Sequence, residues 1–522
     1  MFLLDMMFAP IRFAVGIPIA VVEKLTYNVT KEEKYGGPSD VSVYDLAEPN
    51  LDLCSMIYFY TELRSETKKL IKKFADEKGL STESKSTPSD LEILYNAINE
   101  VETRFEQLKV SSNPTVALSK YKDSEKQLEN LSTKFNITEG DVKVFTQYFK
   151  IISTKPKSNT DIKRDLRLFY EYISPQFRLG FGGTEFNIKN VEDLVELDED
   201  SYVYYIDDDF TKTSMDLGFI NGLDSEIVYA IVISDKNKTI SVVFRGSVNA
   251  NDWITNIQCG SVECKFPGFT TERGMETTDR QTFGRVHEGF YKYLCGETQE
   301  GRNGSSKSKG EEIIGMLKAL VNGEKKGYSI IITGHSLGGA LSTLMSARAV
   351  ALNDFDAPIL NVSFASPFVG DQVFRDHFYD WEKMNRVKHL RVANYEDVVP
   401  LIPVCTFPGA DFHFYKHTGM HVKLFNKSLL HHYTYQLAYP KKDCLVNEVR
   451  NSVHSNLFNG VNINMLNHLC PEYEKRLSAA KDDLEKVNLW DLYLNNHKTG
   501  WTYEKNAITT HTEESPEEEG KE

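Results

Sequence analysis

The stretch TGHSLGGAL, residues 333–341, places Ser336 in a G-x-S-x-G pattern. A serine hydroxyl becomes a nucleophile when a base takes its proton and an acid fixes the tautomer of that base. The pentapeptide alone is common, so its neighbours must decide what it means. An apolar run of strand type precedes it at 328–333, and an apolar run of helical type follows at 340–350. This order predicts a sharp strand-to-helix turn that presents Ser336 as a nucleophile.

The two glycines beside Ser336 fit the same turn. Gly334 and Gly338 stand where side chains at a strained bend would meet neighbouring backbone. The helix that begins after Ser336 would direct its N-terminal N–H groups and positive dipole end toward a developing oxyanion. The pattern therefore predicts a site for nucleophilic attack on a carbonyl group.

The partner acid is expected after a later strand, in the chain order serine, acid, histidine. The segment HLRVANYEDVVPLIP, residues 389–403, has a strand pattern that runs into a loop containing Asp397. Asp397 is the predicted acid, and Glu396 is the neighbouring alternative. Asp371 lies in VGDQVF, where it is expected to cap a helix.

The base is harder to assign because several histidines follow Asp397. His413, His417 and His421 lie before or at the start of HVKLF, which is predicted as the last strand, too early for a base on the loop beyond it. The other candidates are His431, His432, His454 and His468. His468 is favoured because it directly precedes a helix whose start is marked by Pro471. His431 or His432, and His454, stay open as alternatives.

The surrounding elements indicate an α/β fold. From about residue 225, apolar strand runs alternate with helical runs, which predicts a mostly parallel sheet covered by helices on both faces. The sequence predicts four parts: a hydrophobic segment at 1–30, a mainly helical region at 31–200 that packs in part onto the core, an α/β domain at 201–490 and an acidic, disordered tail at 491–522.

The N-terminal segment is unusually apolar. Its uncharged run from Phe13 to Val22 would span about 15 Å as a helix, roughly half of a bilayer core. A membrane-surface anchor is favoured. An atypical secretion signal or signal anchor and a buried segment of the fold are the alternatives. Membrane association is therefore the favoured localisation, with a secretory or endomembrane compartment also open.

Composition excludes some classes of protein. The net charge of −15 argues against nucleic-acid binding, which needs clustered Lys and Arg. No Cys or His spacing typical of a metal site occurs, so no metal is expected. The seven cysteines leave at least one thiol unpaired and do not define the redox compartment.

Five blocks, in order, resemble the class 3, fungal-type lipases of the α/β-hydrolase superfamily. They are VVFRGSVNANDWITNI, VHEGFYKYL, TGHSLGGAL, FASPFVGDQVF and YEDVVPLIP. The resemblance covers about 225–480, with the helical run at 43–63 as a possible opening element. It implies Ser336 as nucleophile and Asp397 as acid.

The resemblance also assigns supporting groups. The backbone N–H groups of Ser247 and Leu337 would form the oxyanion hole, and His468 fits the family's ending through Tyr473. Trp253 and Ile254 fall where the family carries its lid, although a buried Trp253 without a lid function is the alternative. About forty residues separate the last predicted strand from His468, more than compact members of the family need. His432 and His454 therefore stay open as alternative bases.

The expected activity is a serine carboxylic-ester hydrolase of lipase type, acting without a cofactor. Its expected substrate is an acylglycerol or another glycerolipid ester, met at a membrane or lipid-droplet surface. A soluble esterase or acyltransferase is one alternative, and a membrane-associated lipid-binding scaffold or pseudoenzyme is another. The sequence leaves the head group, the acyl-chain length and the oligomeric state undefined.

Overall fold

The structure is a computed structural model of the 522-residue chain. It describes residues 41–80, 92–93, 95–96, 151, 157–173, 197, 200–207, 228–247, 260–266, 282–296, 308–352, 355, 358–403, 405–406, 413–426, 435–438 and 465–489.

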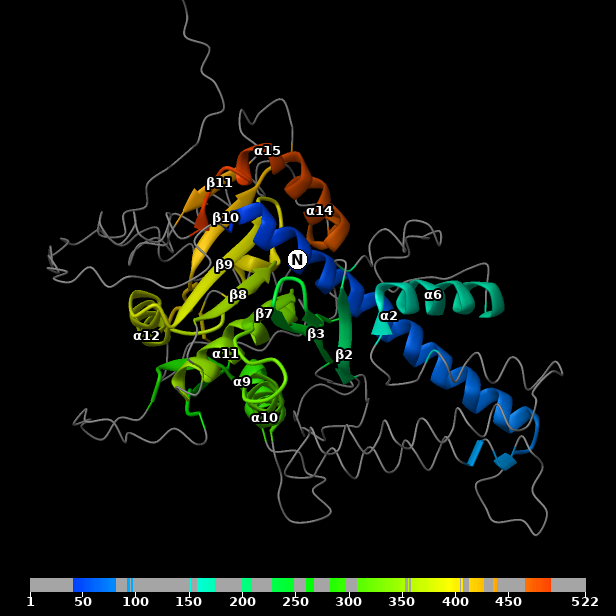
Figure 1. Cartoon of the computed structure of the whole chain (residues 1–522). Helices are drawn as coiled ribbons and strands as arrows, with labels where there is room; N and C mark the ends of the chain where they lie inside the picture. Colours follow the sequence, from blue (N-terminus) through cyan, green and yellow to red (C-terminus); the bar gives the residue numbers. More distant parts are fainter. Residues whose placement is uncertain are drawn as a thin grey trace, which may run out of the picture.

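A large twisted sheet forms the centre of the described fold, in the order β1-β2-β3-β4-β7-β8-β9-β10-β11 (Figure 1). Strands β4, β7, β8, β9 and β10 run parallel to one another, whereas β1 to β3 and β11 add antiparallel pairs at the two edges. The bounds are β1 Lys157–Ser158, β2 Ser201–Asp207, β3 Tyr229–Ser234, β4 Thr239–Phe244, β7 Ser329–His335, β8 Ile359–Phe364, β9 Val387–Asn394, β10 Met420–Leu424 and β11 Tyr435–Ala438.

Helices cover both faces of this sheet, as the alternation of strands and helices predicts. On one face lie α2 (Val43–Glu77), α14 (Cys470–Ala479) and α15 (Lys481–Leu484). On the other lie α9 (Glu288–Cys295), α10 (Lys309–Val321), α11 (Leu337–Ala351) and α12 (Gln372–Lys383). The predicted α/β-hydrolase fold is confirmed, with a parallel centre buried on both sides.

The central strands are built from apolar β-formers, and every residue of β3, β8 and β9 is buried. Helix α11 is buried on all sides because small residues line it, which lets it lie close to the sheet. The remaining elements are α6 (Asn159–Ile173), β5 (Ser261–Glu263), β6 (Arg285–His287), and the short 3-10 turns η1 (Val399–Leu401) and η2 (Met465–His468).

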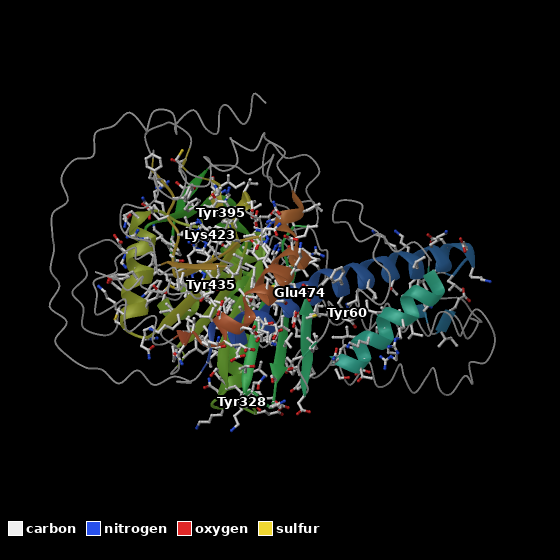
Figure 2. All side chains as sticks on the ribbon, turned by 90° about the horizontal axis from the view of Figure 1, so that it is seen from above. Tyr60, Tyr328, Tyr395, Lys423, Tyr435 and Glu474 are labelled. Carbon is white, nitrogen blue, oxygen red and sulfur yellow. The ribbon has the colours of Figure 1, made fainter. Side chains whose placement is uncertain are left out.

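Helix α2 joins the predicted helical region to the hydrolase core. Its first two thirds, residues 43–64, are mostly buried in the cluster that includes strands β7 to β10 and helix α14. Its C-terminal third extends away from the sheet beside α6 (Figures 1 and 2). The boundary near residue 200 stays a prediction, but α2 and β1 show that earlier residues contribute to this core.

The predicted end of the sheet was wrong. HVKLF corresponds to β10, but β11 pairs antiparallel beyond it, with His421 opposite Ala438. Tyr435 and Leu437 alternate toward the core over only four residues, too short a run for its period to be recognised. The predicted helix cap is confirmed, since the Asp371 carboxylate accepts a hydrogen bond of 2.9 Å from the Phe374 N–H.

Several predicted segments lie outside the described residues. They are the apolar segment at 1–30, most of residues 81–156 in the predicted helical region and the acidic tail at 491–522. Within the described ranges, none of the helices combines the length and apolar character needed to cross a bilayer.

Candidate active site

Ser336 occupies the turn between β7 and α11 that the sequence predicts. Its φ of 59° and ψ of −126° place it in a strained conformation that side-chain-bearing residues rarely adopt. Its N–H donates to the carbonyl of Phe364 at 2.9 Å, which ties the turn to the neighbouring strand β8. The strain is therefore held by the sheet and the helix on either side.

Close backbone packing explains the flanking glycines. A Cβ at Gly334 would lie 2.2 Å from the carbonyl oxygen of Gly338. A Cβ at Gly338 would lie 2.2 Å from the carbonyl oxygen of Phe244, at the end of β4. Glycine at both positions lets the turn close and brings the end of β4 against the first turn of α11.

Asp397 and His468 meet although 71 residues separate them. His468 Nδ1 lies 2.9 Å from Asp397 Oδ2, and both side chains are almost completely buried. Asp397 follows the C-terminal end of β9, and its Oδ1 accepts a 3.0 Å bond from the Val399 N–H. When His468 Nδ1–H donates to the Asp397 carboxylate, the proton of the neutral ring is on Nδ1. The other ring nitrogen, Nε2, then has the lone pair that can accept a proton.

Tyr473, on α14, completes the surroundings of this carboxylate. Its hydroxyl donates to Asp397 Oδ2 at 2.7 Å and accepts from the Asn394 N–H at 3.1 Å. Burial and the adjacent Asp397 raise the Tyr473 pKa well above its usual value, so the phenol stays a hydrogen-bond donor. The tyrosine implied by the family resemblance thus lies in contact with the predicted acid.

Glu396, the alternative acid, has a different environment. It forms an ion pair with Arg476 of α14, and Arg476 also donates to Asn467 Oδ1 at 2.8 Å. The Asn467 carbonyl accepts a 2.8 Å bond from the Asn394 side chain. The two contacts of Asn467 hold the turn that carries His468 against the end of β9.

The remaining reactive atoms have no partner in the described structure. Ser336 Oγ and His468 Nε2 are both buried and make no hydrogen bond to any described residue. A buried polar atom left unpaired costs about 1–3 kcal/mol, so such atoms mark functional or strained sites. In a serine–histidine mechanism these two atoms exchange the proton.

The predicted oxyanion donors follow the ends of two adjacent parallel strands. Phe244 of β4 pairs with Gly334 of β7, so Ser247 follows the end of one strand and Leu337 begins the helix after the other. A Cβ at Gly246 would lie 3.0 Å from Ser336 Cβ, which places this loop beside Ser336. The first N–H groups of a helix lack intrahelical acceptors and are suited to an oxyanion.

Two further side chains near the site were not predicted from the sequence. His335 directly precedes Ser336, and its ring centroid lies 4.7 Å from that of His468. Tyr58 comes from helix α2, and its hydroxyl lies 3.1 Å from His335 Nδ1. His335 stands inside the quoted G-x-S-x-G pattern, but the contact with Tyr58 depends on tertiary packing.

The lid candidates Trp253 and Ile254 lie outside the described residues, as do the alternative bases His431, His432 and His454. Among the described residues, no three His, Cys, Asp or Glu side chains converge in a group that could hold a metal ion. The expected absence of a cofactor stays a prediction.

The parallel sheet, the strained serine at a strand-to-helix turn, and an aspartate–histidine pair from later loops define an α/β-hydrolase. Residues 241–407 match the family Lipase (class 3). This segment is therefore a class 3 lipase segment, as its motifs indicate.

Curated relatives match over part of their length. The chain is 29% identical over 175 residues to phospholipase A1-IIgamma of Arabidopsis thaliana, covering 32% of this chain and 39% of the relative. It is 27% identical over 206 residues to the secreted mono- and diacylglycerol lipase 1 of Fusarium solani, covering 39% and 49%. The chain thus spans less than half the length of these two relatives.

Solved structures also align with the chain. A triacylglycerol lipase from Penicillium expansum matches at 18% identity with a TM-score of 0.33, covering 48% of this chain and 79% of that one. A Rhizomucor miehei triacylglyceride lipase matches at 23% identity with a TM-score of 0.31, covering 43% and 71%.

Proposed function

We propose that the protein is a serine carboxylic-ester hydrolase of lipase type, with Ser336 as nucleophile, His468 as base and Asp397 as acid. The observation that carries the proposal is the 2.9 Å contact between His468 Nδ1 and Asp397 Oδ2, with His468 Nε2 and Ser336 Oγ both buried without a partner. The strained backbone of Ser336 supports the same assignment.

The proposed reaction has two halves. Ser336 Oγ attacks the ester carbonyl carbon while its proton passes to His468 Nε2, and Asp397 stabilises the resulting imidazolium. The oxyanion accepts hydrogen bonds from the backbone N–H groups of Ser247 and Leu337, each worth about 3 kcal/mol of barrier. The intermediate collapses when the carbon–oxygen bond to the leaving group breaks and His468 returns the proton to the departing alcohol.

The acyl-enzyme is then hydrolysed by the same groups. A water molecule attacks the acyl carbon and gives a proton to His468 Nε2, and a second oxyanion forms. Its collapse breaks the bond to Ser336 Oγ, which recovers the proton from His468. The carboxylic acid leaves and the resting site is restored.

The proposed substrate class is a glycerolipid ester. It is supported by the names of two relatives, a phospholipase A1 and a mono- and diacylglycerol lipase. The apolar N-terminal residues favour a substrate presented at a membrane or lipid-droplet surface, which we propose as the place of action.

The test combines active-site labelling with turnover. A fluorophosphonate probe should label the wild-type protein, and emulsified diacylglycerol and phosphatidylcholine vesicles should release fatty acid. Ser336→Ala should lose both labelling and turnover. Undiminished labelling of Ser336→Ala would refute the assignment of the nucleophile. Turnover of soluble short-chain esters alone would favour the esterase alternative.

A further inference from the structure

One face of helix α2 lies against the strand ends that carry the proposed site. The side chains involved recur at helical spacing, i, i+4 and i+7, so they share one stripe. Their contacts are Cys54 Sγ with Thr333 Oγ1 at 3.7 Å, the Tyr58 hydroxyl with His335 Nδ1 at 3.1 Å, and Thr61 Oγ1 with Arg245 Nη1 at 2.9 Å. The stripe therefore touches both β7, before Ser336, and the turn after β4.

The hydrogen bonds of His335 have a defined direction. Its Nε2 lies 2.7 Å from the backbone carbonyl oxygen of His468. A carbonyl can only accept, so Nε2 carries the proton. Burial, with the nearby His468, holds the His335 pKa well below its usual value, so the ring is neutral and Nδ1 is a lone-pair acceptor. The Tyr58 hydroxyl must then donate to Nδ1.

The hydroxyl of Tyr58 also contacts the oxyanion loop. Its oxygen accepts a hydrogen bond from the Gly246 N–H. A Cβ at Gly246 would lie 1.9 Å from this oxygen, so the close approach requires glycine. The hydrogen bonds thus run from Gly246 through Tyr58 and His335 to the main chain of His468.

We propose that Tyr58 and His335 are positioning residues that hold the main chain of His468 and of the Gly246–Ser247 loop in fixed places around Ser336. The kinetic consequence rests on the function proposed above. The proposed nucleophile, base and oxyanion donor come from three separate segments: the turn at Ser336, the turn at His468 and the Gly246–Ser247 loop. The hydrogen bonds of Tyr58 and His335 connect all three segments. Helix α2 is then part of the catalytic framework.

The reason for a kinetic effect is geometric. His468 ends a short turn, and its backbone carbonyl oxygen is hydrogen-bonded to the side chain of His335, the residue before Ser336. Loss of the Tyr58 hydroxyl leaves His335 Nδ1 and the Gly246 N–H without that partner, and both segments can shift. A displacement of about 1 Å at reacting groups reduces the rate by about 100-fold, so a smaller displacement should still lower kcat measurably.

The first test compares two tyrosines of the same helix. Tyr58→Phe should lower kcat about tenfold with little change in KM, the rate equivalent of one buried hydrogen bond. Tyr60→Phe is the matched control, because Tyr60 is also buried in α2 (Figure 2) but donates to Asp165 of α6 at 2.9 Å instead of to a residue beside Ser336. Both variants lose one hydroxyl, so both should unfold at a lower temperature, and rates are compared well below that range. Equal kcat values for the two variants would overturn the proposal.

A second comparison separates hydrogen bonding from shape. The amide nitrogen of His335→Gln can replace Nε2 as donor to the His468 carbonyl, whereas His335→Leu cannot. We expect kcat to fall about 100-fold in His335→Leu and to recover at least tenfold in His335→Gln. Equal losses in the two variants would contradict positioning by this hydrogen bond.

A measurement independent of turnover distinguishes this proposal from the proposed function. In spectra of ¹⁵N-labelled histidines at pH 7, His335 should be the Nε2–H tautomer. Tyr58→Phe should shift the signals of His335 and His468, and Tyr60→Phe should shift neither. An inactive wild-type protein with these spectra would refute the esterase assignment and keep the hydrogen-bond chain. An Nδ1–H tautomer at His335 would refute the chain whatever the activity.

Discussion

Gly338→Ala should disable the site while the fold survives. The new Cβ would lie 2.2 Å from the carbonyl oxygen of Phe244 and 3.0 Å from the carbonyl carbon of Arg245. A relaxed carbon–oxygen contact needs about 3.3 Å, so α11 and the end of β4 must separate by about 1 Å. Ser247 lies three residues beyond Phe244, and its N–H would move away from the position of the oxyanion.

The expected loss is about 100-fold in kcat, since a 1 Å error at a reacting group has about that effect, or roughly 2.7 kcal/mol of barrier. Overpacking a buried site lowers the free energy of unfolding by about 1–3 kcal/mol, which leaves a domain of this size folded. The fluorophosphonate labelling rate should fall with kcat, because the same oxyanion contacts stabilise both reactions.

Gly327→Ala is the control. Gly327 has a φ of 82° and no neighbour within 4 Å of a built Cβ, so alanine adds local strain without touching the site. Its melting temperature should fall and its kcat should match the wild type. A Gly338→Ala protein with wild-type kcat would refute the view that the end of β4 supplies the oxyanion donor.

Three further predictions test the environment of the proposed acid and the buried histidines. Asp397→Asn should reduce kcat by about 10⁴-fold, because His468 would lose its correct tautomer. Glu396→Gln weakens only an ion pair and should keep kcat within about threefold of the wild type. A large loss in Glu396→Gln and a small one in Asp397→Asn would exchange the roles of the two residues. Tyr473→Phe should reduce kcat about tenfold and the free energy of unfolding by about 1–3 kcal/mol, measured by urea titration, because two hydrogen bonds of its hydroxyl are lost; unchanged kinetics would contradict this. Burial, reinforced by a nearby arginine, lowers the pKa of His389 to about 3, so its neutral form stabilises the fold fully above about pH 6.5 and that contribution is lost as pH falls toward 3. Between pH 7 and pH 5 the wild type should therefore lose about 2 kcal/mol more of unfolding free energy than His389→Gln; equal losses would contradict the shift.

Local patterns were sufficient to predict the strand-to-helix turn that holds Ser336, the proposed nucleophile. The strand, the glycines and the helix around Ser336 are contiguous in sequence, and each restricts the same turn. The position of Asp397, the proposed acid, was predictable for a similar reason, since it follows the end of a buried strand. His468 was favoured as the base for one local reason, the helix that begins beside it, and this assignment stays a prediction.

Long-range contacts explain what the sequence could not predict. Tyr58 and His335 are 277 residues apart, and the helical period of α2 shows a buried stripe without identifying what it contacts. The edge strand β11 was missed because four residues are too few to show a period of two. The partnership of Glu396 with Arg476 likewise depends on how α14 returns to the sheet.

The most direct measurement is ester turnover by His468→Ala beside His432→Ala and His454→Ala, each with fluorophosphonate labelling and a melting curve. Loss of both turnover and labelling is expected in His468→Ala alone, by about 10⁴-fold or more, with the fold retained. Full activity in His468→Ala, with loss in either of the other two, would contradict the assignment of His468 as the base.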